Sequence, residues 1–417
     1  MVVQLFGLAI VCVVLAGLYT NHYLFVGPLG EGLPDISPTD FELVLAFQIT
    51  AGLCVVWALA LATIATPAVA ARLLDAWERL AASDASARGA GVAAVGLAAI
   101  YTAARFAFNI ETIHAPLQSL TEGTALLPFQ YRALVPWLVR GLTEAVPALT
   151  RVDLRVLYAP FECAASVGVY AAFAYLLRTL GWSARASRLA AFGVFAPLAF
   201  NLAAPWRYNH VFFPYDTPSV AFFTLGLALL LDGRMRAYYA LFVLATLNRE
   251  TTCFLTMAYA ALALGRERPA RIALHVAAQT ALWGGVKAGL AWLYAANLPL
   301  DLRTGGLFSE MIGRSARILV SVPGNVYILF VTMGGLAGVA LLLWGRVRDV
   351  RVRRMAWIAL PFLAGMAVVG ELMEVRIYSE GIPLVAAALA LAVRSVVVEA
   401  AASARAEERS PLAAWTP

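Results

Sequence analysis

The stretch ATLNRETTCFL (residues 245–255) interrupts an otherwise apolar run, residues 238–264. It places three consecutive polar residues, Asn248, Arg249 and Glu250, at the centre of that run. Charged side chains in lipid are costly, so they are rare and usually functional. Whether this segment crosses the membrane or turns back decides on which side of the membrane every later loop lies.

The composition is that of a membrane protein. The chain has 417 residues, of which 62% are hydrophobic and 13% are charged, and its mean hydropathy is +0.78. Soluble domains carry about 25% charged residues. Several apolar runs reach the roughly 20 residues that a helix needs to cross a bilayer core. We therefore expect an all-α, polytopic transmembrane helical bundle.

The positive charge of the chain indicates topology and not nucleic-acid binding. The net charge of +6 comes almost wholly from arginine, because Lys287 is the only lysine. P-loop and GxGxxG patterns are absent from the sequence, so a cytosolic nucleotide site is not expected. Cytoplasmic loops are enriched in arginine and lysine, and this bias assigns each loop to a side.

Placing the arginine-rich loops inside gives about ten spans. The loop 345–354 carries five arginines and anchors the assignment, and the apolar N-terminus is interpreted as a retained helix. The predicted spans are residues 3–26, 43–68, 91–108, 157–177, 189–204, 217–231, 272–296, 318–344, 356–370 and 382–398.

The quoted stretch does not fit this scheme as an ordinary span. Basic segments flank it on both sides, DGRMR (232–236) and GRERPAR (265–271). A single crossing would place one of them outside. We therefore predict a re-entrant, broken helix pair in which each half has about 12 residues, roughly 18 Å, too short to span. Its turn would lie where protein or a water-filled cavity surrounds the backbone. A single tilted span stays open as the alternative.

A long polar stretch, residues 109–155, follows the third span on the outer side. Within it, YRALVPWLVRGLTEAV (131–146) has apolar residues near helical spacing with polar residues between them. This pattern favours a helix that lies along the membrane interface.

Polar residues gather near the outer face of this map. Arginines there oppose the topology bias, so we infer an anionic ligand in a water-filled cavity that opens outward. The residues concerned are Arg105, Asn109, Glu111, Arg132, Glu162, Arg207, Asn209, His210, Asp216, Glu371, Glu374, Arg376 and Glu380.

Each of these residues also has a structural interpretation. Asp216 precedes Thr217-Pro218 and fits a helix cap. Arg132 fits either snorkelling towards the interface or a pair with Glu122. His210 fits an ordinary loop residue, because no second His or Cys is near it.

The residues of the later segments have alternatives as well. Arg249 and Glu250 are adjacent, so they would neutralise each other. Lys287 would counter a carboxylate or bind phosphate. Glu371 and Glu374 share a helix face, where they would pair with Arg376 or flank a site.

The motifs resemble those of integral-membrane glycosyltransferases of the GT-C superfamily, of the bacterial, polyprenyl-phosphate-sugar-dependent type. The resemblance covers about residues 91–391 and is one of layout and short motifs. The matching segments are PFQYRALVPWL, YDTPSVAFFTLGLALLL, LATLNRETTCFL and EVRIYSEGIPL.

This resemblance implies transfer of a sugar from a polyprenyl-phosphate donor to an acceptor, with inversion and a carboxylate base. The family usually has an Asp in the first outer loop of the module, and residues 109–132 contain none. Glu111 and Glu122 are the carboxylates there, and Glu111 takes the role because it is nearest the membrane. If the module began at the first span, Asp35 or Asp40 would match instead.

The resemblance also implies the remaining site residues. Asp216 is the second catalytic candidate, and no cofactor is certain. A divalent cation held by Asp216, Glu250 and Glu374 stays open. The predicted phosphate-binding or substrate-binding residues are Arg132, Arg207, His210, Asn248, Arg249, Glu250, Glu374 and Arg376.

The resemblance sets the expected organisation and partners. We expect two N-terminal helices in residues 1–90, the catalytic module in 91–398 and a cytoplasmic tail in 399–417. The partners would be the lipid-linked donor, a glycan, lipid or protein acceptor and membrane lipids, with no nucleic acid. The protein would lie in a bacterial inner membrane with its site facing the periplasm. The alternative is a transporter or flippase of a lipid-linked or anionic solute, for which broken helices and intramembrane charges are also typical.

Overall fold

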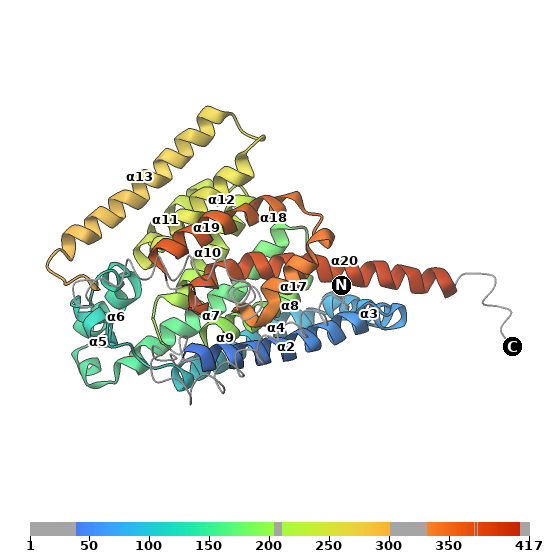
Figure 1. The fold of residues 1–417 in the computed structure, drawn as a ribbon, viewed down its shortest axis with the longest axis horizontal. Helices are drawn as coiled ribbons and strands as arrows, with labels where there is room; N and C mark the ends of the chain where they lie inside the picture. Colours follow the sequence, from blue (N-terminus) through green and yellow to red (C-terminus); the bar gives the residue numbers. More distant parts are fainter. Residues whose placement is uncertain (1–38, 204–210, 301–331, 371, 373, 409–417) are drawn as a thin grey trace, which may run out of the picture. The chain divides into compact units, whose positions relative to one another are not determined.

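The computed structural model describes residues 39–203, 211–300, 332–370, 372 and 374–408. These residues form helices joined by turns, with no strand among them (Figure 1). The all-α prediction is therefore confirmed for this part of the chain. The chain divides into two compact units. Unit 1 comprises Met1–Ser86, Arg317–Arg348 and Val385–Pro417, and unit 2 comprises Ala87–Ala316 and Asp349–Leu384. The predicted catalytic module, residues 91–398, stays a prediction.

Unit 1 contains two helices that meet at a sharp bend. The helix pair Ala51–Ile64 and Pro67–Ala82 is bent by 84°, at the point where Pro67 restarts the helix. Trp57 Nε1 donates to Gly334 O at 3.0 Å and ties the first helix to a later turn. The described elements are α2 (Thr39–Ile64), α3 (Pro67–Ala82), η5 (Thr332–Gly335), α17 (Leu336–Leu342), η6 (Trp344–Arg346) and most of α20 (Ile382–Glu408).

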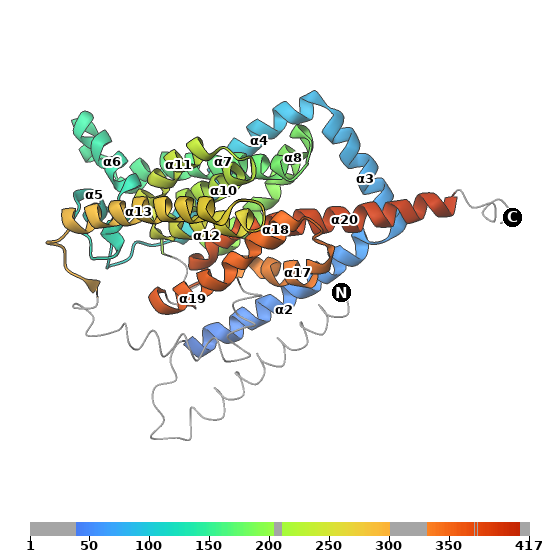
Figure 2. The ribbon, with the colours of Figure 1, turned by 90° about the horizontal axis from the view of Figure 1, so that it is seen from above.

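Unit 2 contains the helices that build the candidate site. α7 and α10 pack along their length, and α11 packs beside α10 (Figures 1 and 2). The elements are α4 (Asp84–Phe108), α5 (Leu117–Glu122), η1 (Phe129–Tyr131), α6 (Leu134–Ala145), η2 (Pro147–Arg151), α7 (Leu154–Thr179), α8 (Ala184–Ala190), η3 (Ala191–Val194), α9 (Phe195–Leu202), α10 (Asp216–Leu231), α11 (Met235–Asn248), η4 (Glu250–Thr252), α12 (Cys253–Ala263), α13 (Pro269–Leu293), α18 (Val350–Met355), η7 (Ala356–Ile358), α19 (Ala359–Val369) and η8 (Val375–Gly381).

The quoted stretch is a helical hairpin, as predicted. α11 ends at Asn248 and α12 begins at Cys253. Tyr239, near the start of α11, and Tyr259, near the end of α12, both contact His275 on α13, with ring centroids 5.9 and 5.2 Å away. The two halves therefore run along the same helix α13 in opposite directions, which excludes a single straight span. We call the end of unit 2 that carries the hairpin tip the apex end, and the opposite end the basic end.

The tip of the hairpin lies farther along the same helix α13. Trp283 Nε1 donates to the backbone oxygen of Glu250 at 2.9 Å, two turns beyond the contacts with His275. These contacts show that α11 runs along α13 from His275 towards Trp283 and that α12 runs back towards His275. Placement of this hairpin in a membrane stays a prediction.

The described residues contain fewer candidate spans than the ten predicted for the whole chain. Three helices in the described residues are long and apolar enough to cross a membrane: residues 84–108, 154–179 and 375–406. The bent pair in unit 1 would be a fourth if it acts as one span. The predicted spans 217–231 and 356–370 contain only shorter helices, α10 and α19. The predicted span 3–26 and most of 318–344 lie outside the described residues. About ten spans are therefore not confirmed.

The predicted interfacial segment is an amphipathic helix. α6 buries Val135, Pro136 and Val139 on one face. Its exposed side carries the charged pair of Arg140 and Glu144, together with the exposed Leu138 and Leu142. The helix and its two faces are confirmed, and its position at an interface stays a prediction.

The close approach of α10 to the hairpin depends on Gly226. A Cβ atom at this position would lie 2.6 Å from Leu255 Cδ1, and Leu255 is fully buried. Gly226→Ala is therefore expected to lower the free energy of unfolding by about 1–3 kcal/mol through overpacking. The matched control is Gly168→Ala on α7, whose Cβ would meet Ala221 at an ordinary 3.6 Å. Equal thermal stability of the two variants would contradict the close packing of Gly226 against Leu255.

Candidate functional site

Six charged side chains meet at the apex end of unit 2. Three are arginines and three are carboxylates, so their formal charges cancel, and all are buried. They come from α4, α7, α10, the hairpin tip and η8, elements that are far apart in the sequence. We call this set the buried charge network; its members are Arg105, Glu162, Asp216, Arg249, Arg376 and Glu380.

Asp216 is the hub of this network. Its Oδ1 lies 3.3 Å from Arg249 Nη1 and 3.7 Å from Arg376 Nη1, and its Oδ2 lies 3.6 Å from Arg105 Nη2. Glu162 and Glu380 balance the outer arginines, since Arg105 Nε is 2.9 Å from Glu162 and Arg249 Nη1 is 3.0 Å from Glu380. A buried charge is tolerated only when it is paired and hydrogen-bonded in this way.

Hydroxyl groups bind one oxygen of each outer carboxylate, Oε1, whereas the Oε2 atoms of Glu162 and Glu380 have no hydrogen-bond partner among the described residues. Ser219 and Thr251 each donate to Glu380 Oε1 at 2.7 Å. Thr217 donates to Glu162 and lies 3.1 Å from the hydroxyl of Tyr101. The network therefore joins α4, α7, α10, the hairpin and η8 through directional contacts.

A second group of charges at the hairpin tip is only partly buried. We call Arg132, Glu250 and Lys287 the apex cluster. Arg132 binds Glu250 through a two-pronged contact, with Nε at 3.1 and 3.2 Å from the two carboxylate oxygens, and Lys287 Nζ lies 3.5 Å from Glu250 Oε2. The side chain of Glu250 is 32% exposed, against 11% for Arg132. The cluster has two cations and one carboxylate, and so a formal charge of +1.

The charges of this cluster hold Glu250 ionised. Burial alone would raise the pKa of Glu250, but the charges of Arg132 and Lys287 outweigh burial and lower that pKa below its usual range. Burial likewise opposes the charge of Arg132, yet Glu250 holds the Arg132 pKa above its usual value. The pair is therefore an ion pair over the physiological pH range.

Aromatic rings separate the apex cluster from the buried charge network. The guanidinium of Arg132 lies over the Tyr215 ring at 4.7 Å, and that of Arg376 lies over the Phe213 ring at 4.2 Å. Phe213 stacks on Tyr215, with centroids 5.2 Å apart, and Phe129 stacks on Phe213 at 5.5 Å. These cation–π contacts hold both arginines in fixed orientations.

Tyr215 is also a hydrogen-bond partner of the apex cluster. Its hydroxyl accepts from Arg132 Nη1 at 2.8 Å, and burial raises its pKa to about 12, so it stays a neutral hydroxyl. Asn248 Nδ2 donates to Tyr215 O at 2.9 Å and is fully buried. Asn248 thus joins the hairpin tip to the start of α10, and its Oδ1 has no hydrogen-bond partner among the described residues.

Arg249 and Glu250 do not neutralise each other, which corrects one sequence interpretation. The backbone at Arg249 is extended, with φ −159° and ψ 144°, and successive side chains of an extended chain point to opposite sides. Arg249 therefore faces Asp216, whereas Glu250 faces Arg132. The second prediction for Arg132, a pair with Glu122, is also wrong.

The cap interpretation of Asp216 is wrong as well. α10 begins at Asp216, Tyr215 occupies the cap position, and no side chain caps the helix. The predicted pairing of Glu374 with Arg376 is confirmed at 2.7 Å. Of the two interpretations of Lys287, countering a carboxylate or binding phosphate, the structure shows the first, because Lys287 pairs with Glu250.

Glu111 lies in a different part of the apex end. Its Oε2 accepts from the backbone N–H of Leu117 at 3.0 Å, which holds the start of α5, and its Oε1 lies 3.2 Å from Arg155 Nε. Its side chain is one-third exposed. The structure thus separates the two catalytic candidates, with Glu111 accessible and Asp216 enclosed. Arg207, His210, Glu371 and Asp35 lie outside the described residues.

A groove of about 600 Å³ lies between α4 and α7 near Glu111. Its walls are mostly apolar, including Phe106 and Val156, and Arg155 lies at its lining. Thr102 is another lining residue, but its hydroxyl oxygen is buried and has no hydrogen-bond partner in the described part of the chain. An apolar groove with a cation in its lining suits an amphipathic ligand.

The described residues offer no cluster of side chains for the divalent cation that the sequence left open. Within the described ranges, no group of three or more His, Cys, Asp or Glu side chains is placed to hold a metal ion. Asp216, Glu250 and Glu374 each contact their own arginines.

The sequence interpretation left Arg105, Glu162 and Glu380 out of the site. Each was identified as a polar residue near the outer face, but the sequence around such a residue does not show which distant charge it pairs with. Only Glu380 could have been assigned to the site from sequence, since it lies four residues after Arg376 in the motif EVRIYSEGIPL that suggested the site.

Comparison with known proteins yields no relatives. No family model, no curated protein and no solved structure matches this chain.

Proposed function

We propose that this protein is an integral-membrane glycosyltransferase. It moves a sugar from a polyprenyl-phosphate donor to an acceptor hydroxyl on the extracytoplasmic face of a bacterial inner membrane. The observation that carries the proposal is the apex cluster, in which Arg132 and Lys287 share the single carboxylate of Glu250. A phosphate that displaces Glu250 meets a preformed, positively charged site with a planar guanidinium fork.

The groove between α4 and α7 supports a lipid-linked donor. Its volume of about 600 Å³ and its mostly apolar lining suit part of a prenyl chain, and it lies on two helices that are long and apolar enough to cross a membrane. Arg155 supplies a cation for the headgroup of such a lipid. The apolar residues around Leu117 and Tyr215 form one cluster that borders both Glu111 and the apex cluster.

The chemistry requires a base and a stabilised leaving group. The acceptor oxygen attacks the anomeric carbon, the bond from that carbon to the phosphate oxygen breaks, and the electron pair leaves with the polyprenyl phosphate. Glu111 accepts the hydroxyl proton. Arg132 and Lys287 stabilise the phosphate that departs. Asp216 is a positioning residue in this proposal, since it is enclosed by three arginines.

The proposal is tested by turnover of polyprenyl-phosphate sugars in proteoliposomes. Wild-type protein with added envelope acceptors is expected to release polyprenyl phosphate from one of a panel of labelled donors. Glu111→Gln is expected to lower that rate by about 10²–10⁴-fold, because it removes the general base. Donor binding, measured separately, should change little.

Glu122→Gln is the matched control, since Glu122 lies in the same loop and is exposed. Wild-type rates in Glu111→Gln would contradict the role of this residue. Movement of the intact donor across the membrane without release of polyprenyl phosphate would favour the flippase alternative.

A further inference from the structure

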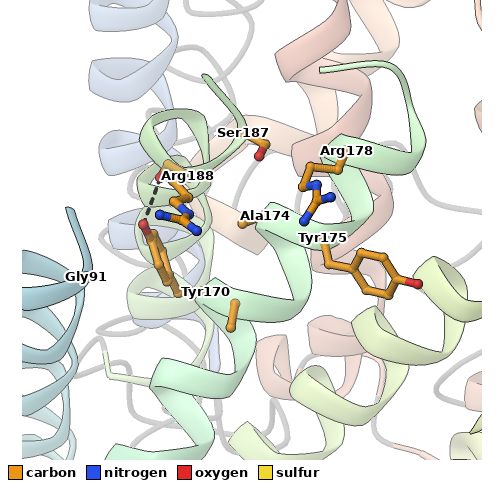
Figure 3. A pocket seen from close by; sticks show the side chains of 8 residues that line it. Gly91, Tyr170, Ala174, Tyr175, Arg178, Ser187 and Arg188 are labelled. Atoms are coloured by element: carbon orange, nitrogen blue, oxygen red, sulfur yellow. Dashed lines mark hydrogen bonds between the residues drawn. The ribbon is translucent and has the colours of Figure 1, made fainter. Parts of the chain in front are cut away.

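A separate cavity of about 280 Å³ lies at the basic end of unit 2. It is lined by α7, α8 and the first turns of α4, and Figure 3 shows Arg178 and Arg188 on either side of Ala174. α7 ends just beyond Arg178, so the cavity lies at the end of unit 2 opposite the hairpin tip.

The two arginines bring uncompensated charge to this cavity. Neither guanidinium forms an ion pair within the part of the chain that the structure describes. The one carboxylate tied to the lining is Asp232, which accepts from the hydroxyl of Tyr175. The lining itself therefore carries a charge of +2, which attracts an anion.

The other polar groups of the lining are already engaged. Tyr170 donates to the backbone oxygen of Arg188 at 3.0 Å (Figure 3), and Ser187 donates to Ala184 O at 3.1 Å. Donors for a ligand must come from Arg178 and Arg188, whose planar groups suit phosphate oxygens.

The rest of the wall is small and apolar, formed by Ala171, Ala174 and Gly91. A cavity in which two arginines flank a small apolar wall fits a ligand that has both a charged and an apolar part. It lies at the ends of α4 and α7, both apolar and long enough to span a bilayer. Lipid headgroups occupy that level.

We propose that this cavity binds the phosphate group of an anionic membrane phospholipid. The phosphate lies between Arg178 and Arg188, and the glycerol part lies against the apolar wall. This site is separate from the apex cluster and does not depend on the transfer reaction.

Native mass spectrometry of the detergent-purified chain tests the site, with phosphatidylglycerol and phosphatidylcholine as probes. The wild type is expected to bind phosphatidylglycerol at least tenfold more tightly. Replacing both arginines by glutamine, R178Q/R188Q, is expected to weaken phosphatidylglycerol binding roughly thirtyfold, about fivefold for each charge.

A second variant keeps the charges and fills the space. A Cβ atom at Gly91 would meet nothing within 4 Å, so Gly91→Leu extends into the cavity without strain and is expected to weaken phosphatidylglycerol binding by a similar factor. The controls are Gly96→Leu, an open and exposed position on the same helix that does not line the cavity, and Arg236→Gln, an exposed arginine elsewhere at the basic end. Both are expected to bind phosphatidylglycerol as the wild type does.

Three results would overturn the proposal. They are equal affinity of the wild type for the two lipids, wild-type phosphatidylglycerol binding in Gly91→Leu and R178Q/R188Q, and tight binding of inorganic phosphate without retention of phosphatidylglycerol. The last result would assign the cavity to a soluble phosphate compound.

Discussion

Asp216→Asn is expected to lower the free energy of unfolding by about 3–5 kcal/mol, because it leaves buried charges without a partner. Asp216 is fully buried and lies within 3.7 Å of three arginines, Arg105, Arg249 and Arg376. Asparagine keeps the shape and removes the charge that balances them. A fall of roughly 10 °C in the transition temperature follows, measured by tryptophan fluorescence of the purified protein in detergent.

Two comparisons separate this cause from a general loss of packing. The double variant D216N/R249Q removes one charge of each sign, so it is expected to be more stable than Asp216→Asn alone. Glu144→Gln breaks an exposed pair with Arg140 on α6 and is expected to leave the transition temperature unchanged. A double variant no more stable than Asp216→Asn would show that charge balance is not what Asp216 provides.

Arg132→Gln is expected to lower the rate of sugar transfer by about 10²–10³-fold, the usual effect of removing one group that stabilises developing negative charge. The guanidinium of Arg132 is held by the Tyr215 ring and hydroxyl and by Glu250. Its side chain keeps 11% exposure, so a ligand that displaces Glu250 can reach it. The reaction rate is measured as release of polyprenyl phosphate from saturating labelled donor.

The stability of the Arg132 variant is expected to change less than that of Asp216→Asn. Lys287 stays as a partner of Glu250, which is itself partly exposed. Arg140→Gln, at an exposed arginine of the neighbouring helix α6, serves as the activity control. Full activity in Arg132→Gln, with normal folding, would remove the apex cluster from the proposed site.

Much of the fold could be predicted from hydrophobic pattern and charge bias. The sequence predicted the helical class, the amphipathic helix after Arg132 and the hairpin at residues 238–264. The hairpin could be predicted because two basic flanks on one apolar run conflict with a single crossing, and this conflict is local in the sequence. The predicted count of about ten spans is not confirmed, because runs such as 217–231 and 356–370 are apolar yet form short helices in the described part of the chain.

The site was only partly predictable for a different reason. Composition and topology indicated which polar residues gather at one end, but several arginines and carboxylates share that end and any pairing among them preserves neutrality. Glu122, in the same loop, was the expected partner of Arg132, whereas the structure pairs Arg132 with Glu250, which is 118 residues away in the chain. The position of each helix end relative to the others decides between them.

The sequence by itself determined that this chain is helical and apolar, that its charges are unevenly distributed, and that residues 248–250 break a helix. These properties follow from residue composition and spacing, which act locally. Only the tertiary structure decided that Arg249 faces Asp216 while its neighbour Glu250 faces Arg132. An extended residue turns adjacent side chains to opposite sides, and what each then meets depends on helices contributed by distant parts of the chain.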